Sequence, residues 1–442
     1  MIRRAAVLLA GALLISSCAS VPSRIASLKS CPNVAPVTTM KVPYPIILLH
    51  GLGQKADVWH GSATQYFSKD LGLSYGGDLR VDSNGQLNTA SPRGGDADFY
   101  TVAFSDPHDS VNAWRDELDL CIQHVLKQTG ADRVILVGYS MGGLAARAYL
   151  VKRFTDHHVK RLITIGTPHL GSPYARIWSW KTEMEQCVRE QNIVIAQPCK
   201  AALAAIQGAE GDVPFNAPAV RDLRRPEDGG EFLRRLSKYA HPLDVEYVSV
   251  IGDVDVLDEV KNLREGAVQE LLRKVLSVGG GSFAELFEAG DGVVSTKSQD
   301  IMNIEYFTVD RSRRRAARVV NVGSVHVDHL AKSSDVQRMV LEDKAEFKGA
   351  SVCLVNGEPT LLVDVADHIP ALCEVSVDIV GVQTPRKVSR RGSAVLCRTQ
   401  DGIVARFFVP LTGVPLDGAE PYSLKITITN TFGYTTTSSI AW

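Results

Sequence analysis

Short apolar runs alternate with amphipathic stretches along the chain up to about residue 340. Each run is rich in β-branched residues and has the length of a buried strand. Between two of the runs, the apolar residues of 111–128 fall on one face of a helix, and Gly130 follows as a stop signal. Such strand–helix–strand alternation predicts a mainly parallel sheet covered by helices, an α/β fold. The predicted strands are residues 44–49, 98–104, 134–137, 159–165, 245–251 and 318–322.

One of these strands, 134–137, runs directly into the sequence GYSMG at 138–142. An Ala-, Leu- and Arg-rich helix is predicted immediately after it, over 143–154. Strand, sharp turn and helix form the context of a nucleophile elbow, which exposes a serine hydroxyl above a sheet. The two glycines leave room, because a Cβ at 138 or 142 would press on the strand or the helix. The pattern therefore predicts Ser140 as a nucleophile.

Four further segments follow predicted strands or buried runs and carry the residue types of a hydrolytic site. Because the carboxyl ends of parallel strands meet at one edge of a sheet, we expect several of them near Ser140. The order of serine, acid and histidine along the chain is the order found in α/β-hydrolases. The segments are HGLGQ at 50–54, GTPHLGS at 166–172, GDGVVS at 290–295 and the loop around His326.

Together these segments resemble the bacterial lipase and esterase branch of the α/β-hydrolases, including the GPI inositol-deacylase-like members. The resemblance implies a catalytic triad of Ser140, Asp291 and His326. It also implies an oxyanion hole made by the backbone N–H groups of Leu52 and Met141. Acyl transfer of this kind needs no cofactor and no metal.

Two of these assignments have competitors in the sequence. Asp253 directly follows the strand 245–251 and is the alternative acid, whereas small residues surround Asp291 as in the family pattern. His329 is the alternative base, or it begins the next helix with Asp328 as its N-cap or as a supporting group. His169 is also close to a strand end, but the resemblance implies that it shapes the site rather than acting as the base.

The sequence also divides the chain into parts. We expect a signal peptide over 1–18, a linker over 19–41 and an α/β-hydrolase domain over 42–345. Within that domain, 173–242 is predicted to be a cap insertion, which would exclude water from the site. Beyond the hydrolase domain, short strand-like runs separated by Asn-Gly and Asp-Gly turns predict a small β-sandwich-like domain over 350–442.

The first residues carry an export signal. A basic start precedes an apolar run over 5–15, which is too short to span a bilayer. The sequence ISSC at 15–18 resembles a bacterial lipobox, which implies a lipid on Cys18 and an outer-membrane lipoprotein facing the periplasm or the exterior. Ordinary cleavage near Ala19 is the alternative and gives a periplasmic or secreted protein. The formal net charge of −1 gives no basis for nucleic-acid binding.

The eight cysteines contain no Cys-x-x-Cys pair, so the sequence shows no zinc or redox motif. Export permits disulfides. Residues 69–98 are rich in Gly, Asp and Asn and are expected to form a solvated loop, since their spacing matches no calcium-binding EF-hand. The cysteine expectations are a pair between Cys187 and Cys199, a pair among Cys353, Cys373 and Cys397, and a core position for Cys121.

The expected reaction is hydrolysis of carboxylic esters with an apolar acyl group, such as acylglycerols. Three related activities can use the same triad, namely those of a thioesterase, an acyltransferase and a phospholipid deacylase. A different class of function is a non-catalytic envelope lipoprotein that keeps a hydrolase fold and works through its C-terminal β domain. Intact candidates for serine, acid and histidine argue against that last alternative.

Overall fold

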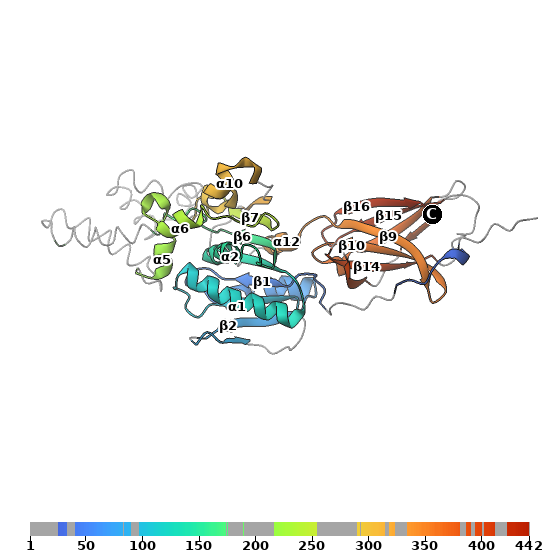
Figure 1. Cartoon of the computed structure of the whole chain (residues 1–442), viewed down its shortest axis with the longest axis horizontal. Coiled ribbons are helices and arrows are strands. Elements are labelled where there is room, and N and C mark those ends of the chain that lie inside the picture. Colours follow the sequence, from blue (N-terminus) through green and yellow to red (C-terminus); the bar gives the residue numbers. More distant parts are fainter. Residues whose placement is uncertain are drawn as a thin grey trace, which may run out of the picture.

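Two structural units lie side by side along the longest axis of the molecule (Figure 1). One is built on an eight-stranded sheet with helices, and the other consists of two four-stranded sheets. Among the described residues, no helix combines the length and the apolar character needed to cross a bilayer. The computed structural model describes residues 25–32, 40–82, 84–89, 97–173, 175, 189, 216–253, 290–291, 293–313, 318–322, 334–380, 386–389, 394–399, 402–411 and 422–441.

The large sheet is mainly parallel, as the sequence predicts. Its strand order is β3-β2-β4-β1-β5-β6-β7-β8, and only β3 runs antiparallel to its neighbour. The six predicted strands are present as β1 and β4 to β8. The strands are β1 (Ile46–Leu49), β2 (Tyr75–Val81), β3 (Leu87–Thr89), β4 (Phe99–Ala103), β5 (Val134–Tyr139), β6 (Val159–Ile165), β7 (Glu246–Gly252) and β8 (Arg318–Val322).

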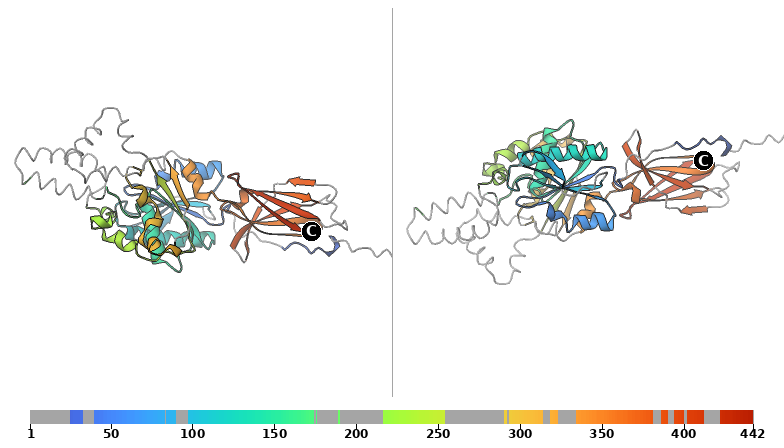
Figure 2. Two further views of the ribbon diagram at one scale, coloured as in Figure 1. Left: turned by 90° about the horizontal axis from the view of Figure 1, so that it is seen from above. Right: turned by 90° about the horizontal axis from the view of Figure 1, so that it is seen from below.

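Helices cover both faces of this sheet (Figure 2). On one face, Ile47 and Leu49 pack with α1 (Val111–Thr129) and α2 (Met141–Lys152) in a single apolar core. On the other face, Ile46 and Leu48 pack in a second core with side chains of η2, η3 and α12. The shorter helices are η1 (Ile25–Ser27), η2 (Ala56–Trp59), η3 (Gln65–Asp70), α5 (Pro218–Asp222), η4 (Pro226–Asp228), α6 (Glu231–Leu236), α9 (Thr296–Gln299), η6 (Ile301–Asn303), α10 (Glu305–Val309), η7 (Arg311–Arg313), α12 (Ser334–Leu341) and η8 (Pro370–Leu372).

The prediction of a solvated loop over 69–98 is wrong for part of that segment. It contains β2, which pairs with β4 inside the sheet, and β3, which pairs with β2. The polar residue Asp78 interrupts the apolar pattern by which a buried strand is predicted. In the structure it is buried and accepts hydrogen bonds from Tyr75 and Thr101 at 2.7 and 2.5 Å. The hydroxyls of Tyr75 in the same strand and of Thr101 in β4 thus replace the water that this carboxylate loses.

The C-terminal unit is a β-sandwich, which confirms the predicted fold of this region. Two antiparallel sheets have the orders β13-β14-β10-β9 and β12-β11-β15-β16. One apolar core joins them, with Leu361 and Val363 from the first sheet and Val375 and Val377 from the second. The strands are β9 (Glu346–Val355), β10 (Glu358–Ala366), β11 (Glu374–Val380), β12 (Arg386–Ser389), β13 (Ala394–Thr399), β14 (Gly402–Pro410), β15 (Ser423–Thr429) and β16 (Thr435–Ala441).

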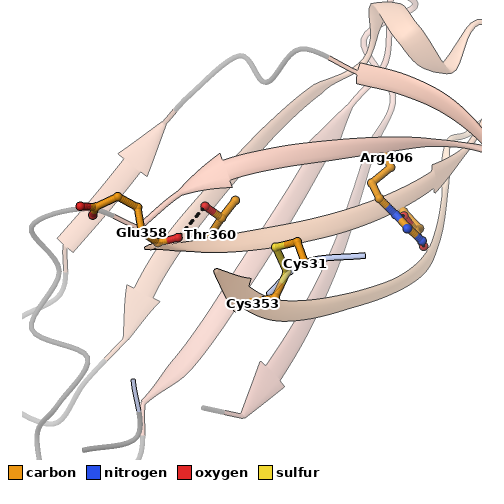
Figure 3. The surroundings of a disulfide bond; sticks show 6 residues. Cys31, Cys353, Glu358, Thr360 and Arg406 are labelled. Carbon is orange, nitrogen blue, oxygen red and sulfur yellow. Dashed lines mark hydrogen bonds and ion pairs between the residues drawn. A yellow bond between two sulfur atoms is a disulfide. The ribbon is translucent and has the colours of Figure 1, made fainter. Parts of the chain in front are cut away.

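The expected disulfide among the C-terminal cysteines is wrong. Cys353 is bonded to Cys31, with a Cα–Cα distance of 5.0 Å, while Cys373 and Cys397 are free and buried (Figure 3). Cys353 on β9 and Cys397 on β13 lie at opposite edges of one sheet, roughly 14 Å apart at about 4.8 Å per strand, too far for a disulfide. Cys121 is a free core residue as predicted, and Cys187 and Cys199 lie outside the described residues.

Part of the segment expected as a linker is therefore attached to the sandwich. Cys31 donates a backbone hydrogen bond to Leu354, and Leu354 donates one to Lys29, both at 2.9 Å. Ile25 packs against the sandwich core. Figure 1 places η1 at the end of the sandwich that is remote from the large sheet.

Candidate active site

Ser140 stands at the sharp turn between β5 and α2. Its backbone angles, φ 51° and ψ −123°, lie outside the regions that serine normally occupies. Two backbone hydrogen bonds hold the turn, one from Ser140 N–H to the Ile165 carbonyl at 2.8 Å and one from Gly143 N–H to the Ser140 carbonyl at 3.1 Å. The side chain is partly exposed. The elbow predicted from the sequence is thus present, with the serine at its apex.

The glycines beside Ser140 are required by close backbone contacts. A Cβ at position 138 would lie 2.4 Å from the Gly143 Cα, inside the first turn of α2. A Cβ at position 142 would lie 2.5 Å from the His50 carbonyl oxygen, at the end of the neighbouring strand β1. Real Cβ atoms do not approach other heavy atoms this closely. The strained turn is therefore locked by packing from both sides.

The segment after β1 forms a tight loop beside this turn. The ring of His50 is buried, and its Nε2 accepts a hydrogen bond from Phe104 N–H at 3.3 Å, so that Nδ1 is left to donate to the Gly51 carbonyl at 2.8 Å. Gln54 closes the loop by accepting from Gly51 N–H at 3.0 Å. Burial lowers the pKa of His50 to about 4, so the ring is neutral near pH 7. His50 and Gln54 fix the loop and take no visible part as acid or base.

The two predicted oxyanion donors belong to these adjoining elements. Leu52 lies in the loop after β1, and Met141 is the first residue of α2. Leu49 and Gly138 are paired neighbours in the sheet, so β1 and β5 end side by side. No described residue accepts a hydrogen bond from the Leu52 or Met141 N–H. A cavity of about 460 Å³ borders the loop from Gly53 onward.

The two candidate acids have different environments. Asp291 is buried, and its Oδ1 accepts hydrogen bonds from the N–H groups of Val293 and Val294 at 3.0 and 2.8 Å. A Cβ at Gly290 would lie 2.2 Å from the Val294 carbonyl oxygen, so the small residue is needed for this turn. Asp253, in contrast, is exposed to solvent. A carboxylate that orients an imidazole is typically buried and fixed, which matches Asp291.

The acid segment is fastened to the strand ends by side chains that the sequence analysis did not single out. Gln299 donates to the carbonyls of Gly252 and Val294 at 3.1 and 2.8 Å and accepts from Gly252 N–H at 2.8 Å. The hydroxyl of Ser172 donates to the Val293 carbonyl at 2.7 Å. These bonds place the acid segment next to the ends of β6 and β7.

The base cannot be assigned by contact, since His326, His329 and Asp328 lie outside the described residues, as do Cys18 and most of the predicted cap. The strand that leads to the histidines is described. β8 runs parallel to β7, with Val322 paired to Gly252. The C-terminal end of β8 therefore lies at the same edge of the sheet as Ser140.

A fully buried arginine on the nucleophile helix is the main feature that sequence reasoning missed. Arg147 donates to the carbonyl and to Nδ1 of His169, both at 3.1 Å, to Nε2 of His241 at 3.3 Å, and to the Leu236 carbonyl at 3.4 Å. Burial lowers the pKa of the guanidinium to about 9, so it remains charged near pH 7. In the sequence it is one arginine among helix-forming residues, with no sign that it faces inward.

This network explains why His169 is not a base. Burial lowers the pKa of His169 far below its usual value, and the nearby Arg147 charge adds to the effect. Its Nδ1 accepts from Arg147, which leaves Nε2 to donate to the Thr164 hydroxyl at 3.2 Å. The backbone N–H of His169 donates to the Ser298 carbonyl at 2.8 Å. His169 thus connects α2 to the acid segment, consistent with a shaping role.

One cluster has the ligand types of a metal site, but its neighbours argue against a cation there. Ligand atoms of Glu246, Asp343 and His368 lie within 4.8 Å of one another. The Arg161 guanidinium already donates to Glu246 at 3.0 Å and to Asp343 at 2.7 Å. An arginine charge in contact with both carboxylates disfavours a bound divalent ion. The cluster is better understood as an ionic contact between the large sheet and the start of the sandwich.

Comparisons with known proteins agree with this geometry. Residues 43–204 match the family model of the PGAP1-like alpha/beta domain. A triacylglycerol lipase from Burkholderia plantarii is 32% identical over 143 residues, covering 32% of this chain and 34% of that protein. A triacylglycerol lipase from Pseudarthrobacter phenanthrenivorans is 32% identical over 133 residues, covering 30% of this chain and 35% of that protein. The chain therefore matches these curated relatives over about a third of their length.

Among solved structures, the mature lipase of Bacillus licheniformis aligns with 70% of this chain and 94% of its own. The identity is 18% and the TM-score is 0.37.

Proposed function

We propose that this chain, which belongs to the lipase and esterase family of α/β-hydrolases, hydrolyses carboxylic esters through an acyl-enzyme on Ser140. The observation that carries the proposal is the strained elbow, in which packing holds a serine at φ 51° beside the loop that ends β1. A serine in an unfavourable backbone conformation, maintained by contacts on both sides, points to a function at that position.

In the proposed mechanism, His326 accepts the proton of the Ser140 hydroxyl as the oxygen attacks the ester carbonyl. The N–H groups of Leu52 and Met141 donate to the oxyanion of the tetrahedral intermediate. The imidazolium then protonates the leaving alcohol, and the acyl group remains on Ser140. Water, activated by the same histidine, attacks the acyl-enzyme, which releases the carboxylic acid and regenerates the serine.

Asp291 is assigned the orienting role in this mechanism. Two backbone N–H groups donate to its Oδ1 and fix the carboxylate, which in this proposal accepts a hydrogen bond from the histidine. A fixed carboxylate selects the tautomer of the imidazole and stabilises its charged form. His329 and Asp253 remain the alternatives for base and acid.

The substrates we propose are lipid esters, with acylglycerols first. Sequence similarity supports this class, since both relatives described above are named triacylglycerol lipases. The proposed location is the bacterial envelope, with a lipid on Cys18 as the anchor. Because residues 25–32 of the expected linker lie on the sandwich, an anchor at Cys18 would emerge from the sandwich end of the molecule.

A substrate panel tests the reaction class. The protein is assayed with p-nitrophenyl esters of increasing acyl length, with emulsified triacylglycerol, with phospholipid and with an acyl thioester, and again with glycerol as acceptor. Ester hydrolysis that exceeds thioester hydrolysis and transfer to glycerol supports the proposal. Preference for the thioester or for glycerol would replace it by a thioesterase or an acyltransferase, and inactivity on every substrate would favour a non-catalytic envelope protein.

A further inference from the structure

A second cavity lies at the opposite end of the nucleophile helix from Ser140. It has a volume of about 320 Å³ and is formed where the last turn of α2 meets α1 and α6. Its α2 residues begin at Ala148, eight residues after Ser140 and therefore roughly 12 Å along the helix at 1.5 Å per residue. The cavity is thus separate from the elbow and plays no part in the proposed mechanism.

The floor of this cavity is apolar. Ala148 and Leu236 are buried there, and Val151 and Phe232 are partly buried. Tyr239 stands at the margin with half of its surface exposed (50%), one of the few large apolar or aromatic side chains that the described residues expose. Phe232 and Leu236 are four residues apart on α6, so one face of that helix supplies both.

Cations surround the floor. Arg115, Lys152 and Arg235 line the cavity, and no acidic side chain of the described residues does. Two carboxylates just outside it hold these cations in place: Asp116 contacts Arg115 and Lys152 at 2.8 and 2.7 Å, and Glu231 contacts Arg235 at 3.5 Å. Lys152 also lies 3.9 Å from Asp119, which pairs with Arg153, and Glu231 is shared with Arg234. Counted over all of these ion pairs, with Asp156 as a further partner of Arg153, five positive and four negative side chains leave one positive charge in excess, at the two arginines that share Glu231.

We propose that this cavity binds a monoanionic amphiphile with a single alkyl chain. The apolar floor accommodates the chain, and the rim cations pair with one anionic head group. The volume is at the lower end of the range for small-molecule sites, about 300–1,000 Å³, which suits one chain and excludes a whole triacylglycerol. A free fatty acid has this chemistry and is also the product that the proposed hydrolysis releases.

The site is connected to the catalytic end of α2. Leu236, on the floor, offers its backbone carbonyl to Arg147, which also holds His169. A ligand in the cavity therefore contacts the end of α6. Arg147 links that end of α6 to the loop after β6 by hydrogen bonds to the carbonyls of Leu236 and His169. The binding proposal itself does not depend on ester hydrolysis, because the cavity and its charges exist whether or not Ser140 is reactive.

Equilibrium dialysis with radiolabelled decanoate tests the proposal. We expect the wild-type protein to bind decanoate, and Val151→Trp, which fills the cavity, to lose one equivalent of bound decanoate. We expect Lys152→Glu to weaken that binding at least tenfold, whereas Lys425→Glu, the same charge change at an exposed position on the sandwich, leaves it unchanged. Decyltrimethylammonium, which has the opposite head-group charge, is expected to bind at least tenfold more weakly than decanoate.

Several outcomes would overturn the proposal: no decanoate bound by the wild type, equal binding by wild type and Val151→Trp, or equal binding of the cationic amphiphile. Lys152→Glu gives a readout if Val151→Trp does not fold, because Lys152 is exposed and its replacement disturbs no core. Ester hydrolysis is measured on the same variants. Absence of hydrolysis in all of them would contradict the proposed function and leave the binding result to be judged on its own.

Discussion

Ser140 in the large sheet and Asn356 in the sandwich have nearly the same unusual backbone angle, φ 51° and φ 52°. Asn356 needs no special explanation, because it precedes Gly357 in the hairpin between β9 and β10, and Asn-Gly is the sequence that such a tight turn prefers. Serine has no comparable preference, and contacts with neighbouring strands and helix hold Ser140 in place. The φ angle of Asn356 is thus explained by the preference of its turn, whereas the φ angle of Ser140 indicates a function at that position.

The two units also treat buried polar groups differently. The large sheet and its helices bury Arg147, His50, His169 and His241. In the sandwich, Arg406 has an acidic partner, Asp364, which it contacts through two hydrogen bonds of 2.7 Å. No described carboxylate forms an ion pair with Arg147. A charge buried without a carboxylate partner is costly, which is typical of a place where function and not stability alone has shaped the structure.

The largest contrast is expected between the alanine variants of Ser140 and Asn356. Ser140→Ala should lower the rate of ester hydrolysis about 10⁶-fold, because the nucleophile is lost, and should leave the fold intact. Asn356→Ala should leave the rate unchanged and cost about 1 kcal/mol of unfolding free energy, since alanine tolerates this angle less well. Steady-state hydrolysis and denaturant unfolding measure both. Turnover of Ser140→Ala within tenfold of wild type would contradict the mechanism.

The next contrast separates the two candidate acids. Asp291→Asn keeps an oxygen for the Val293 and Val294 N–H groups but removes the charge, so kcat should fall about 10³- to 10⁴-fold through loss of the imidazole's tautomer and charge stabilisation. Asp253→Asn changes an exposed residue and should leave kcat within twofold of wild type. Circular dichroism confirms folding of each variant. The reverse pattern would transfer the role to Asp253.

A pair of glycines tests whether the packing around the elbow matters. Gly142→Ala forces a Cβ to within 2.5 Å of the His50 carbonyl oxygen, and we expect a loss of about 10²-fold in kcat as the oxyanion loop shifts. Gly349→Ala, in β9 of the sandwich, meets open space and should leave kcat unchanged and stability within about 1 kcal/mol. Wild-type activity in Gly142→Ala would show that the elbow tolerates displacement of the adjoining strand.

The fully buried Arg147 and the partly buried Arg406 provide a contrast in stability. Arg147→Met leaves the carbonyls of His169 and Leu236 without their donor and should lower the unfolding free energy by about 2 kcal/mol. Arg406→Met leaves the partly exposed Asp364 unpaired and should cost about 1 kcal/mol, because solvent compensates that carboxylate. Chemical denaturation of each variant measures the difference. A larger loss for Arg406→Met would mean that the Arg147 network contributes little to the fold.

The large unit is also expected to be more sensitive to acid than the sandwich. Burial lowers the pKa of His50 to about 4 and of His241 to about 3, and that of His169 lies far below its usual value. Since the unfolded chain binds protons near pH 6.5 and the folded chain does not, the stability these histidines contribute is present above that pH and is lost as the pH falls from 6.5 toward 4. Fluorescence of the tryptophans in the large unit should report this loss first.

Acid titration of the three variants His50→Gln, His169→Asn and His241→Gln provides the control. Each should reduce the pH dependence between 6.5 and 4, whatever it does to absolute stability. An unchanged pH dependence in all three would assign the acid sensitivity to other groups.

Much of the large sheet can be predicted from sequence because its central strands are buried on both faces and are continuous apolar runs. The exception, β2, contains Gly76, Gly77, Asp78 and Arg80, which break the apolar pattern. The Asp78 carboxylate in this strand accepts hydrogen bonds from the hydroxyls of Tyr75 and Thr101. A sequence does not reveal which hydroxyls will face a carboxylate. Tertiary partners, not local preference, make this segment a strand.

The candidate active site likewise has a part that can be predicted from the sequence and a part that cannot. The elbow and the loop after β1 can be predicted because glycine, serine and histidine stand at fixed distances from strand ends. The supporting contacts of Arg147 and Gln299 depend on segments far away in the chain, and nothing in their own neighbourhood distinguishes them from surface residues. The Cys31–Cys353 disulfide escapes prediction for the same reason, since 322 positions separate the two cysteines in the sequence.

Labelling with a fluorophosphonate, followed by mapping of the modified peptide, tests the central claim most directly. The reagent reacts with serines that an adjacent base activates, and the account predicts a single modified peptide that contains Ser140, no modification in Ser140→Ala, and loss of ester hydrolysis in proportion to labelling. An unlabelled wild-type protein that still hydrolyses esters, or a label on another serine, would contradict the assignment of Ser140 as the nucleophile.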